Sequence, residues 1–118
     1  MDQTLREIAG VKQTSELRRR WWNSRDMDVY VWQDGSGKVH SFEICYGKPR
    51  NERALRWQTE QGFSHARIDD GEAHAFDHQT PIATPDGHYS LESIAQRFEA
   101  AGAEIESAVY RQLMRQLF

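Results

Sequence analysis

The fold of this chain is decided by residues 27–46, MDVYVWQDGSGKVHSFEICY. The run Met27–Trp32 is rich in β-branched and aromatic residues, and Val39–Tyr46 alternates between two kinds of side chain, as strands with one buried face do. Between them, DGSG at 34–37 contains two glycines, which tolerate the positive φ angles of a tight turn. The sequence therefore predicts an antiparallel hairpin over residues 27–46.

A second hairpin is predicted directly downstream. ALRWQT at 54–59 alternates Leu55 and Trp57 with polar side chains, EQG at 60–62 is typical of a turn, and FSHARI at 63–68 returns. The two hairpins together predict a four-stranded antiparallel meander.

A short helix is predicted before the first hairpin. Thr14 or Ser15 can act as its N-cap, and Glu16 falls in its first turn. We expect this helix to run through Leu17 to about Trp21.

Two further helices are predicted at the C-terminal end. Ser90 is a good N-cap, and apolar residues recur at the spacing of one helix face over 91–101 and again over 105–117. One long helix also matches this pattern. We expect instead that the first helix ends near Gly102, with this glycine in the left-handed conformation. Acidic residues then fall in the first turn of the second helix and basic residues toward its last turn, which is favourable with the helix dipole.

These elements define a fold class. The sequence predicts a single α+β domain over residues 1–118, in which a short N-terminal helix and two C-terminal helices accompany the four-stranded meander, the C-terminal pair covering one sheet face. A chain of 118 residues can form one core without covalent staples. The predicted core residues are Tyr30, Trp32, Phe42, Ile44, Leu55, Trp57, Ala66, Ile68, Leu91, Ile94, Phe98, Ile105, Val109 and Leu113.

Cysteine content and hydropathy bear on the compartment. Cys45 is the single cysteine, so no internal disulfide can form, and a lone thiol in a strand is usually a small buried apolar residue. The N-terminal residues have no basic and apolar signal regions, and nowhere do about 18 apolar residues run together. These features predict a cytoplasmic protein without a membrane span.

Charge is divided unevenly along the chain, which has a net charge of −3. Residues 1–59 carry 11 basic and 8 acidic side chains, and residues 60–118 carry 4 and 10. A nucleic-acid-binding domain of this size is usually basic overall, so this class is weakened, although a local basic patch would suffice.

RRRWWNSR at 18–25 is the first candidate site. Arginine next to tryptophan can hold a phosphate while stacking on a base or nucleotide ring. The simpler interpretation is a solvated helix face, because adjacent helical residues point about 100° apart and at least one tryptophan must face the core. The binding residues of this hypothesis are Arg18, Arg19, Arg20, Trp22 and Arg25.

The second candidate is a histidine-rich stretch. Residues 69–88, DDGEAHAFDHQTPIATPDGH, show neither the spacing of a helix nor the alternation of a strand. Loops of this length are often functional or mobile. Imidazole and carboxylate groups at short spacing suit Zn²⁺, although no His-Glu-x-x-His motif is present and a solvated loop is the simpler interpretation. The metal ligands of this hypothesis are His65, His74, His78 and His88.

No motif in the chain ties residue type and spacing to one reaction. There is no Gly-x-Ser-x-Gly elbow, and DGSGK at 34–38 lacks the upstream glycine of a phosphate loop. The sequence therefore favours a binding or regulatory domain that acts through protein contacts, with an unknown protein or a second copy as partner, and predicts neither a catalytic residue nor a cofactor. The alternatives are nucleotide or nucleic-acid binding at 18–25 and a metal-dependent hydrolase that uses the His and Asp residues of 65–88.

Overall fold

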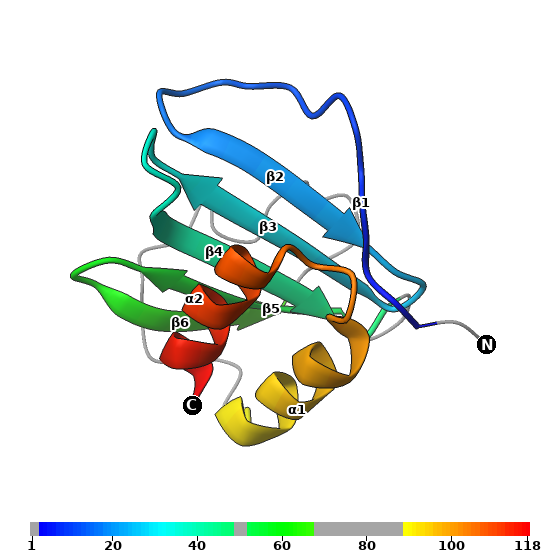
Figure 1. Ribbon diagram of the computed structural model, residues 1–118. Helices are drawn as coiled ribbons and strands as arrows, with labels where there is room; N and C mark the ends of the chain where they lie inside the picture. Colours follow the sequence, from blue (N-terminus) through cyan, green and yellow to red (C-terminus); the bar gives the residue numbers. More distant parts are fainter. Residues whose placement is uncertain (1–2, 49–51, 68–88) are drawn as a thin grey trace.

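The computed structural model describes residues 3–48, 52–67 and 89–118 (Figure 1). Six strands pair in sequence order as an antiparallel meander, and two helices follow. The strands are β1 (Arg6–Glu7), β2 (Arg18–Asn23), β3 (Met27–Gln33), β4 (Val39–Tyr46), β5 (Arg53–Gln58) and β6 (Gly62–Arg67). The helices are α1 (Leu91–Ala101) and α2 (Ser107–Leu117).

The predicted N-terminal helix is wrong, and so is the strand number. Residues 18–23 form β2, which pairs with β3 along its length, and β1 adds a sixth strand to the predicted four. The reason is the pair of adjacent tryptophans, which a strand sends to opposite faces of the sheet. Trp22 is thereby completely buried. A helix cap at Ser15 is worth about 1 kcal/mol, less than burying this side chain.

Both predicted hairpins are confirmed. In the β3–β4 turn the Asp34 N–H donates to Lys38 O, and Gly37 adopts a φ of 91° that favours glycine. In the β5–β6 turn the Gln61 N–H donates to Gln58 O. These turns contain their own hydrogen bonds, which explains why local sequence identified them.

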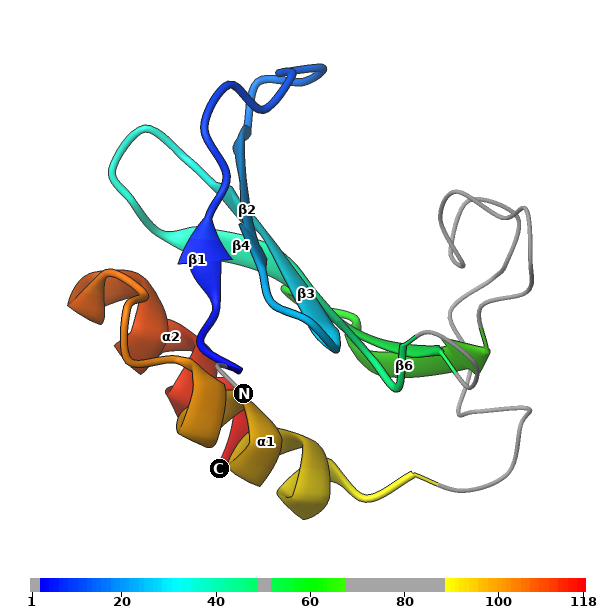
Figure 2. The same ribbon diagram turned by 90° about the vertical axis from the view of Figure 1, so that its right-hand side faces the viewer.

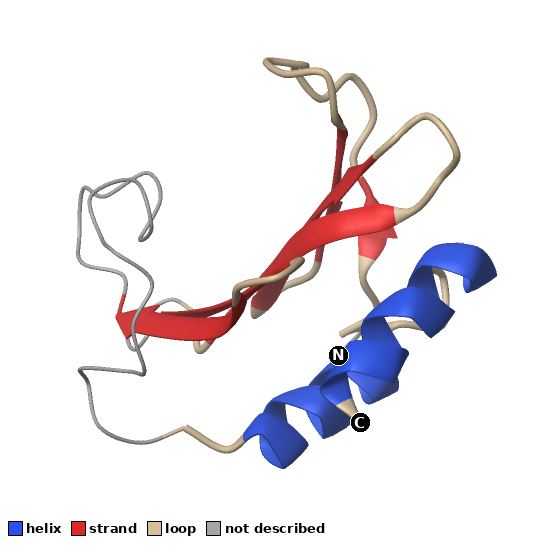
Figure 3. Ribbon diagram, turned by 90° about the vertical axis from the view of Figure 1, so that its left-hand side faces the viewer, coloured by secondary structure: helices blue, strands red, loops and turns tan. Residues whose placement is uncertain are grey.

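The two C-terminal helices are confirmed, and both lie on one face of the sheet (Figures 2 and 3). Ser90 caps α1, since its hydroxyl accepts a hydrogen bond from the Ser93 N–H at 3.0 Å. Gly102 follows α1 but is not left-handed as expected, because its φ is −91°. A Cβ at this position would lie 2.8 Å from a ring carbon of Tyr110, so a larger residue would force that ring to shift and close packing of the helices favours glycine. No helix in the described ranges is long and apolar enough to cross a membrane.

The main core lies between these helices and the sheet. β3 faces it with Val29 and Val31, because the hairpin register sets these residues opposite Ile44 and Phe42. The prediction that Tyr30 and Trp32 belong to this core is therefore wrong, since a side-chain period of two sends them to the other face. Ala66 packs in a smaller cluster on that other face, and Ile68 lies outside the described residues. The buried residues of the main core are Leu5, Trp22, Met27, Val29, Val31, Val39, Phe42, Ile44, Leu55, Ile94, Ala95, Phe98, Ala101, Ile105, Val109, Leu113 and Leu117.

Candidate functional site

β2 divides the arginine–tryptophan candidate between the two faces of the sheet. Because side chains alternate along a strand, Arg20 and Trp22 face the helices, while Arg19 and Trp21 face away. Arg25 is exposed in the turn between β2 and β3. The structure therefore does not gather the five predicted binding residues, which are Arg18, Arg19, Arg20, Trp22 and Arg25.

Arg20 is engaged in a partly buried ion pair. Its side chain is 8% exposed, and it donates two hydrogen bonds to the Glu7 carboxylate, from Nε at 2.8 Å and from Nη2 at 2.9 Å. The carboxylate of Glu106 lies 3.4 Å away, and the guanidinium stacks over Trp22 at 4.7 Å. The hydrogen bond raises the pKa of Arg20 and lowers the pKa of Glu7. Arg20 and Trp22 therefore stabilise the fold.

This ion pair predicts a pH-dependent stability. We expect Glu7→Gln to lower the free energy of unfolding by about 1 kcal/mol at neutral pH, a value discounted because the Glu7 side chain is 39% exposed. The lowered folded-state pKa means that the contribution of Glu7 is present above the pKa of an unfolded glutamate and is lost as the pH falls through the folded pKa. Urea denaturation at neutral pH and at about pH 3 should show the difference shrinking in acid.

Glu104→Gln is the matched control for this prediction. Glu104 pairs with Arg6 at 3.6 Å, and both side chains are more than half exposed, so the pair should contribute little. Equal effects of Glu7→Gln and Glu104→Gln would contradict the expectation that the partly buried Arg20–Glu7 pair contributes more than the exposed Arg6–Glu104 pair.

The histidine candidate is represented by His65 alone among the described residues. His65 is buried in β6, where its ring hydrogen-bonds with the Tyr46 hydroxyl and stacks on Tyr89 at 4.4 Å. Within the described ranges no three His, Cys, Asp or Glu side chains are grouped as metal ligands would be. The other predicted ligands lie outside the described residues: His74, His78 and His88. His65 packs the sheet against the segment that leads into α1.

We predict that the histidines form no structural metal site. A structural zinc site contributes folding energy directly, so a chelator would destabilise a protein that depended on one. The melting temperature should be unchanged by EDTA, and elemental analysis should find no stoichiometric zinc. A drop of about ten degrees, on the order of 1–2 kcal/mol for a domain of this size, would contradict the prediction.

Asp34, Ser36 and His40 contact one another at the β3–β4 hairpin without forming a catalytic triad. The Ser36 hydroxyl donates to one Asp34 oxygen at 2.6 Å, and His40 Nε2 lies 3.0 Å from the other. In a nucleophilic triad the histidine lies between hydroxyl and carboxylate, whereas here the carboxylate lies in the middle. Asp34 also accepts from the backbone N–H groups of Ser36 and Lys38. The Ser36 hydroxyl, followed by His40 and then the backbone hydrogen bonds, lowers the pKa of Asp34. The group stabilises the turn.

Three aromatic side chains line up on the sheet face away from the helices: Trp21, Tyr30 and Trp32, hereafter the aromatic row. Ring centroids are 5.8 Å apart between Trp21 and Tyr30 and 6.3 Å apart between Tyr30 and Trp32, and both pairs are stacked. All three side chains are half-buried. The alternation of side chains along β3 does not by itself show which of its two faces is buried. The signal that identifies the buried face is the pairing of Val29 and Val31 with apolar residues of β4.

Charged groups surround the aromatic row. The Arg56 guanidinium lies over the Trp32 ring at 5.7 Å. At the other end, one Asp28 oxygen accepts a hydrogen bond from the Trp21 indole at 2.9 Å, and the second pairs with Lys48 at 2.8 Å. The aromatic row thus lies between the Arg56 guanidinium at its Trp32 end and the Asp28 carboxylate at its Trp21 end.

Cys45 lies on the same face and confirms the expectation of a buried apolar thiol. It packs with Ala54, Ala66 and Tyr30. Burial raises the pKa of the Cys45 thiol, which disfavours the thiolate that acts as a nucleophile. Cys45 therefore belongs to the packing beneath the aromatic row.

Comparison with known proteins returns no relative. No protein-family model matches this chain. No curated protein and no solved structure matches it either. Its class is defined by its own architecture, an α+β chain whose six-stranded antiparallel meander is covered on one face by two helices.

Proposed function

We propose that this chain is a small cytoplasmic binding or regulatory domain that acts through protein contacts made by the aromatic row. The observation that carries the proposal is the placement of Trp21, Tyr30 and Trp32 together on the face away from the main core. Tryptophan, tyrosine and arginine contribute most of the binding energy at protein interfaces. The aromatic row with Arg56 has this composition.

The aromatic row is ordered by the domain itself. Trp21 is fixed by its hydrogen bond to Asp28 and by stacking on Tyr30, and Trp32 is fixed by stacking on Tyr30 and by Arg56. Immobilising a side chain on binding costs about 0.5–1.5 kcal/mol. Side chains that are already ordered in the free domain avoid part of this cost, which favours binding of a partner at the aromatic row.

Photo-crosslinking in the source cells tests the proposal. A benzophenone amino acid is placed at position 32, in place of Trp32, and in a second protein at position 118, where the Phe118 side chain is 68% exposed at the end of α2. We expect a discrete protein adduct at position 32 that is missing at position 118. An adduct of the chain with itself identifies a second copy as the partner. Identical adducts at both positions, or none at position 32, contradict the proposal.

Nucleic-acid binding is the second candidate, favoured by Arg19, which lies on the same face as the aromatic row. Asp28 and Glu43, two buried carboxylates of this face, oppose a phosphate backbone. We therefore predict that single-stranded oligonucleotides bind no tighter than about 10 µM at physiological salt, the non-specific regime. Tryptophan fluorescence titration at two salt concentrations measures this. Sub-micromolar binding that weakens steeply with salt and is lost in Arg19→Ala would reverse the ranking.

A further inference from the structure

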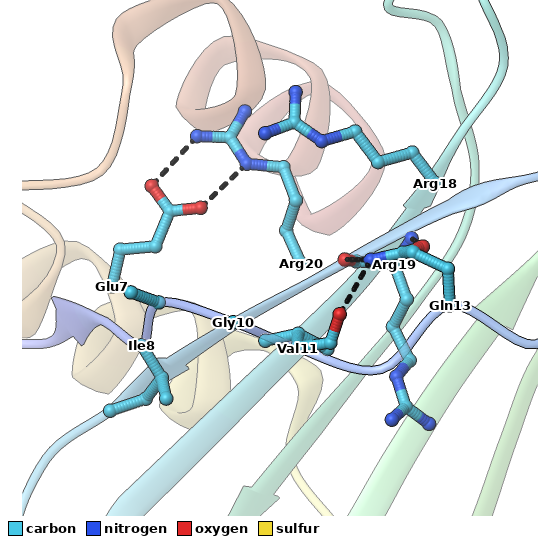
Figure 4. Close-up of a pocket in the computed structure, with 9 residues that line it drawn as sticks. Glu7, Ile8, Gly10, Val11, Gln13, Arg18, Arg19 and Arg20 are labelled. Atoms are coloured by element: carbon cyan, nitrogen blue, oxygen red, sulfur yellow. Dashed lines mark hydrogen bonds and ion pairs between the residues drawn. The ribbon is translucent and has the colours of Figure 1, made fainter.

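The edge of β2 is closed by a side chain where a neighbouring strand would be expected. β1 pairs only with the C-terminal end of β2, at Trp22 and Asn23. At Arg19 the partner is the side-chain amide of Gln13: the Arg19 N–H donates to Gln13 Oε1 at 2.7 Å, and Gln13 Nε2 donates to Arg19 O at 2.9 Å (Figure 4). Two such hydrogen bonds with one residue are the pattern that an antiparallel strand makes.

A cavity borders this edge. The chain runs beside β2 as far as Ile8, whose N–H donates to Trp21 O at 2.9 Å, and then turns at Gly10, which has a φ of 73°. Between the segment 7–13 and residues 18–20 of β2 lies a cavity of about 480 Å³. Figure 4 shows the Gln13 amide reaching the β2 backbone beside this cavity. Space for an extended segment is therefore present next to the strand edge.

Positive charge flanks the edge on both sides. Arg18 lies on the helix side of β2, and Arg19 lies on the opposite side. Within the described ranges no salt bridge joins either arginine to a carboxylate, in contrast to Arg20, which is paired with Glu7. Arg18 is close enough to Glu7 to help lower the Glu7 pKa, but the hydrogen bonds of that carboxylate are made with Arg20. The Nε atom of Arg19 is buried without a hydrogen-bond partner. An occupant with carboxylates on both faces of an extended backbone would complement these two arginines.

We propose that the β2 edge at residues 18–20 binds an extended acidic peptide by strand addition, with the peptide backbone replacing the Gln13 side chain at Arg19. Proteins protect exposed strand edges, and partners that bind by strand addition use the same backbone groups. Two peptide hydrogen bonds replace the two that Gln13 makes with Arg19, so displacement gives up only the exposed hydrogen bond from Gln13 Nε2 to Val11 O at 3.1 Å. A free anion such as phosphate would complement the arginines but would not satisfy the Arg19 N–H and carbonyl together. This site adjoins the aromatic row, because Arg19 lies opposite Trp32 in the β2–β3 pair. It uses the backbone edge of β2 and not the ring faces, so neither proposal depends on the other.

Fluorescence anisotropy with a labelled decapeptide EEVVEEVVEE, which places carboxylates on both faces of an extended backbone, tests the proposal. Arg18→Ala should weaken binding about tenfold, equivalent to about 1.4 kcal/mol. Arg111→Ala, which removes an exposed arginine of α2, is the matched control and should leave binding unchanged. Gln13→Ala should strengthen binding several-fold, because it removes the competing side chain. In NMR spectra the Arg19 amide should shift on titration.

Two further ligands separate strand addition from charge attraction alone. The same decapeptide methylated on every backbone nitrogen keeps its charge but loses its N–H donors, and it should not bind. Inorganic phosphate should not displace the unmodified decapeptide at millimolar concentration. Equal binding of both decapeptides, full displacement by phosphate, equal effects of Arg18→Ala and Arg111→Ala, or no binding of the unmodified decapeptide would each overturn the proposal.

Discussion

Trp22→Ala should lower the free energy of unfolding by about 3–5 kcal/mol, the range for truncating a buried tryptophan. Trp22 is 0% exposed in the main core and lies opposite Val29 in the β2–β3 pair. Its removal also ends the stacking of the Arg20 guanidinium, at 4.7 Å, over the ring. Against a total stability of about 5–15 kcal/mol this loss is large, and it should lower the melting temperature by roughly 10–20 °C. Urea denaturation measures the free energy.

Trp21→Ala is the matched control, because it removes the same side chain one residue away. Trp21 is half-buried on the other face, so we expect a smaller loss of about 1–2 kcal/mol from its stacking and its hydrogen bond to Asp28. The difference between the two variants reports which tryptophan faces the helices. A larger loss for Trp21→Ala than for Trp22→Ala would mean that β2 presents its faces the other way round.

Phe98→Ala should cost about 3–5 kcal/mol for the same reason, at the contact between the helices and the sheet. Phe98 is 0% exposed in α1 and stacks on Tyr110 of α2 with ring centroids 5.5 Å apart. The truncation leaves a cavity where the two helices meet and ends the stacking on Tyr110, and both effects add to the lost burial.

Phe118→Ala provides the comparison for Phe98→Ala. Phe118 is 68% exposed after α2, and substitutions at such positions usually change stability by less than about 0.5 kcal/mol. Chemical denaturation of both variants separates burial from the general effect of losing a phenylalanine. A loss below about 1 kcal/mol for Phe98→Ala would show that α1 does not cover the sheet with this face.

Local signals predicted the elements whose hydrogen bonds are local. The DGSG turn at 34–37 closes its own hairpin, and Ser90 caps α1 through a hydroxyl three residues from its partner. β2 is different: its partner β3 is the next strand along the chain, but the turn at residues 24–26 that joins them contains no glycine to indicate a hairpin. The capping residue Ser15 favoured a helix, and the burial of Trp22 against β3 outweighed that preference.

The candidate sites could be predicted only in part, because the partners of a side chain in a strand depend on which face of the sheet it lies on. The sequence identified Arg18 and Arg19 as candidate binding residues, and the structure places them on the two sides of the β2 edge. It offered no means of knowing that Arg20 is paired with Glu7 or that Gln13 occupies the strand edge at Arg19. These contacts join residues 6 and 13 positions apart, and only the paired strands bring them within hydrogen-bond distance.

The sequence by itself determined the strands β3 to β6 and the helical end of this protein, but not β1 and β2, because turn residues and side-chain periodicity act within a few positions of the chain. Only the tertiary structure decided which face of each strand is buried. Tyr30 and Val31 are equally suited to a strand, and one of them must face away from the helices. Register with β4 sends Val31 to the core and Tyr30 to the aromatic row, since a period of two fixes every other side chain once one pair is set. The binding surface proposed for this protein follows from that choice.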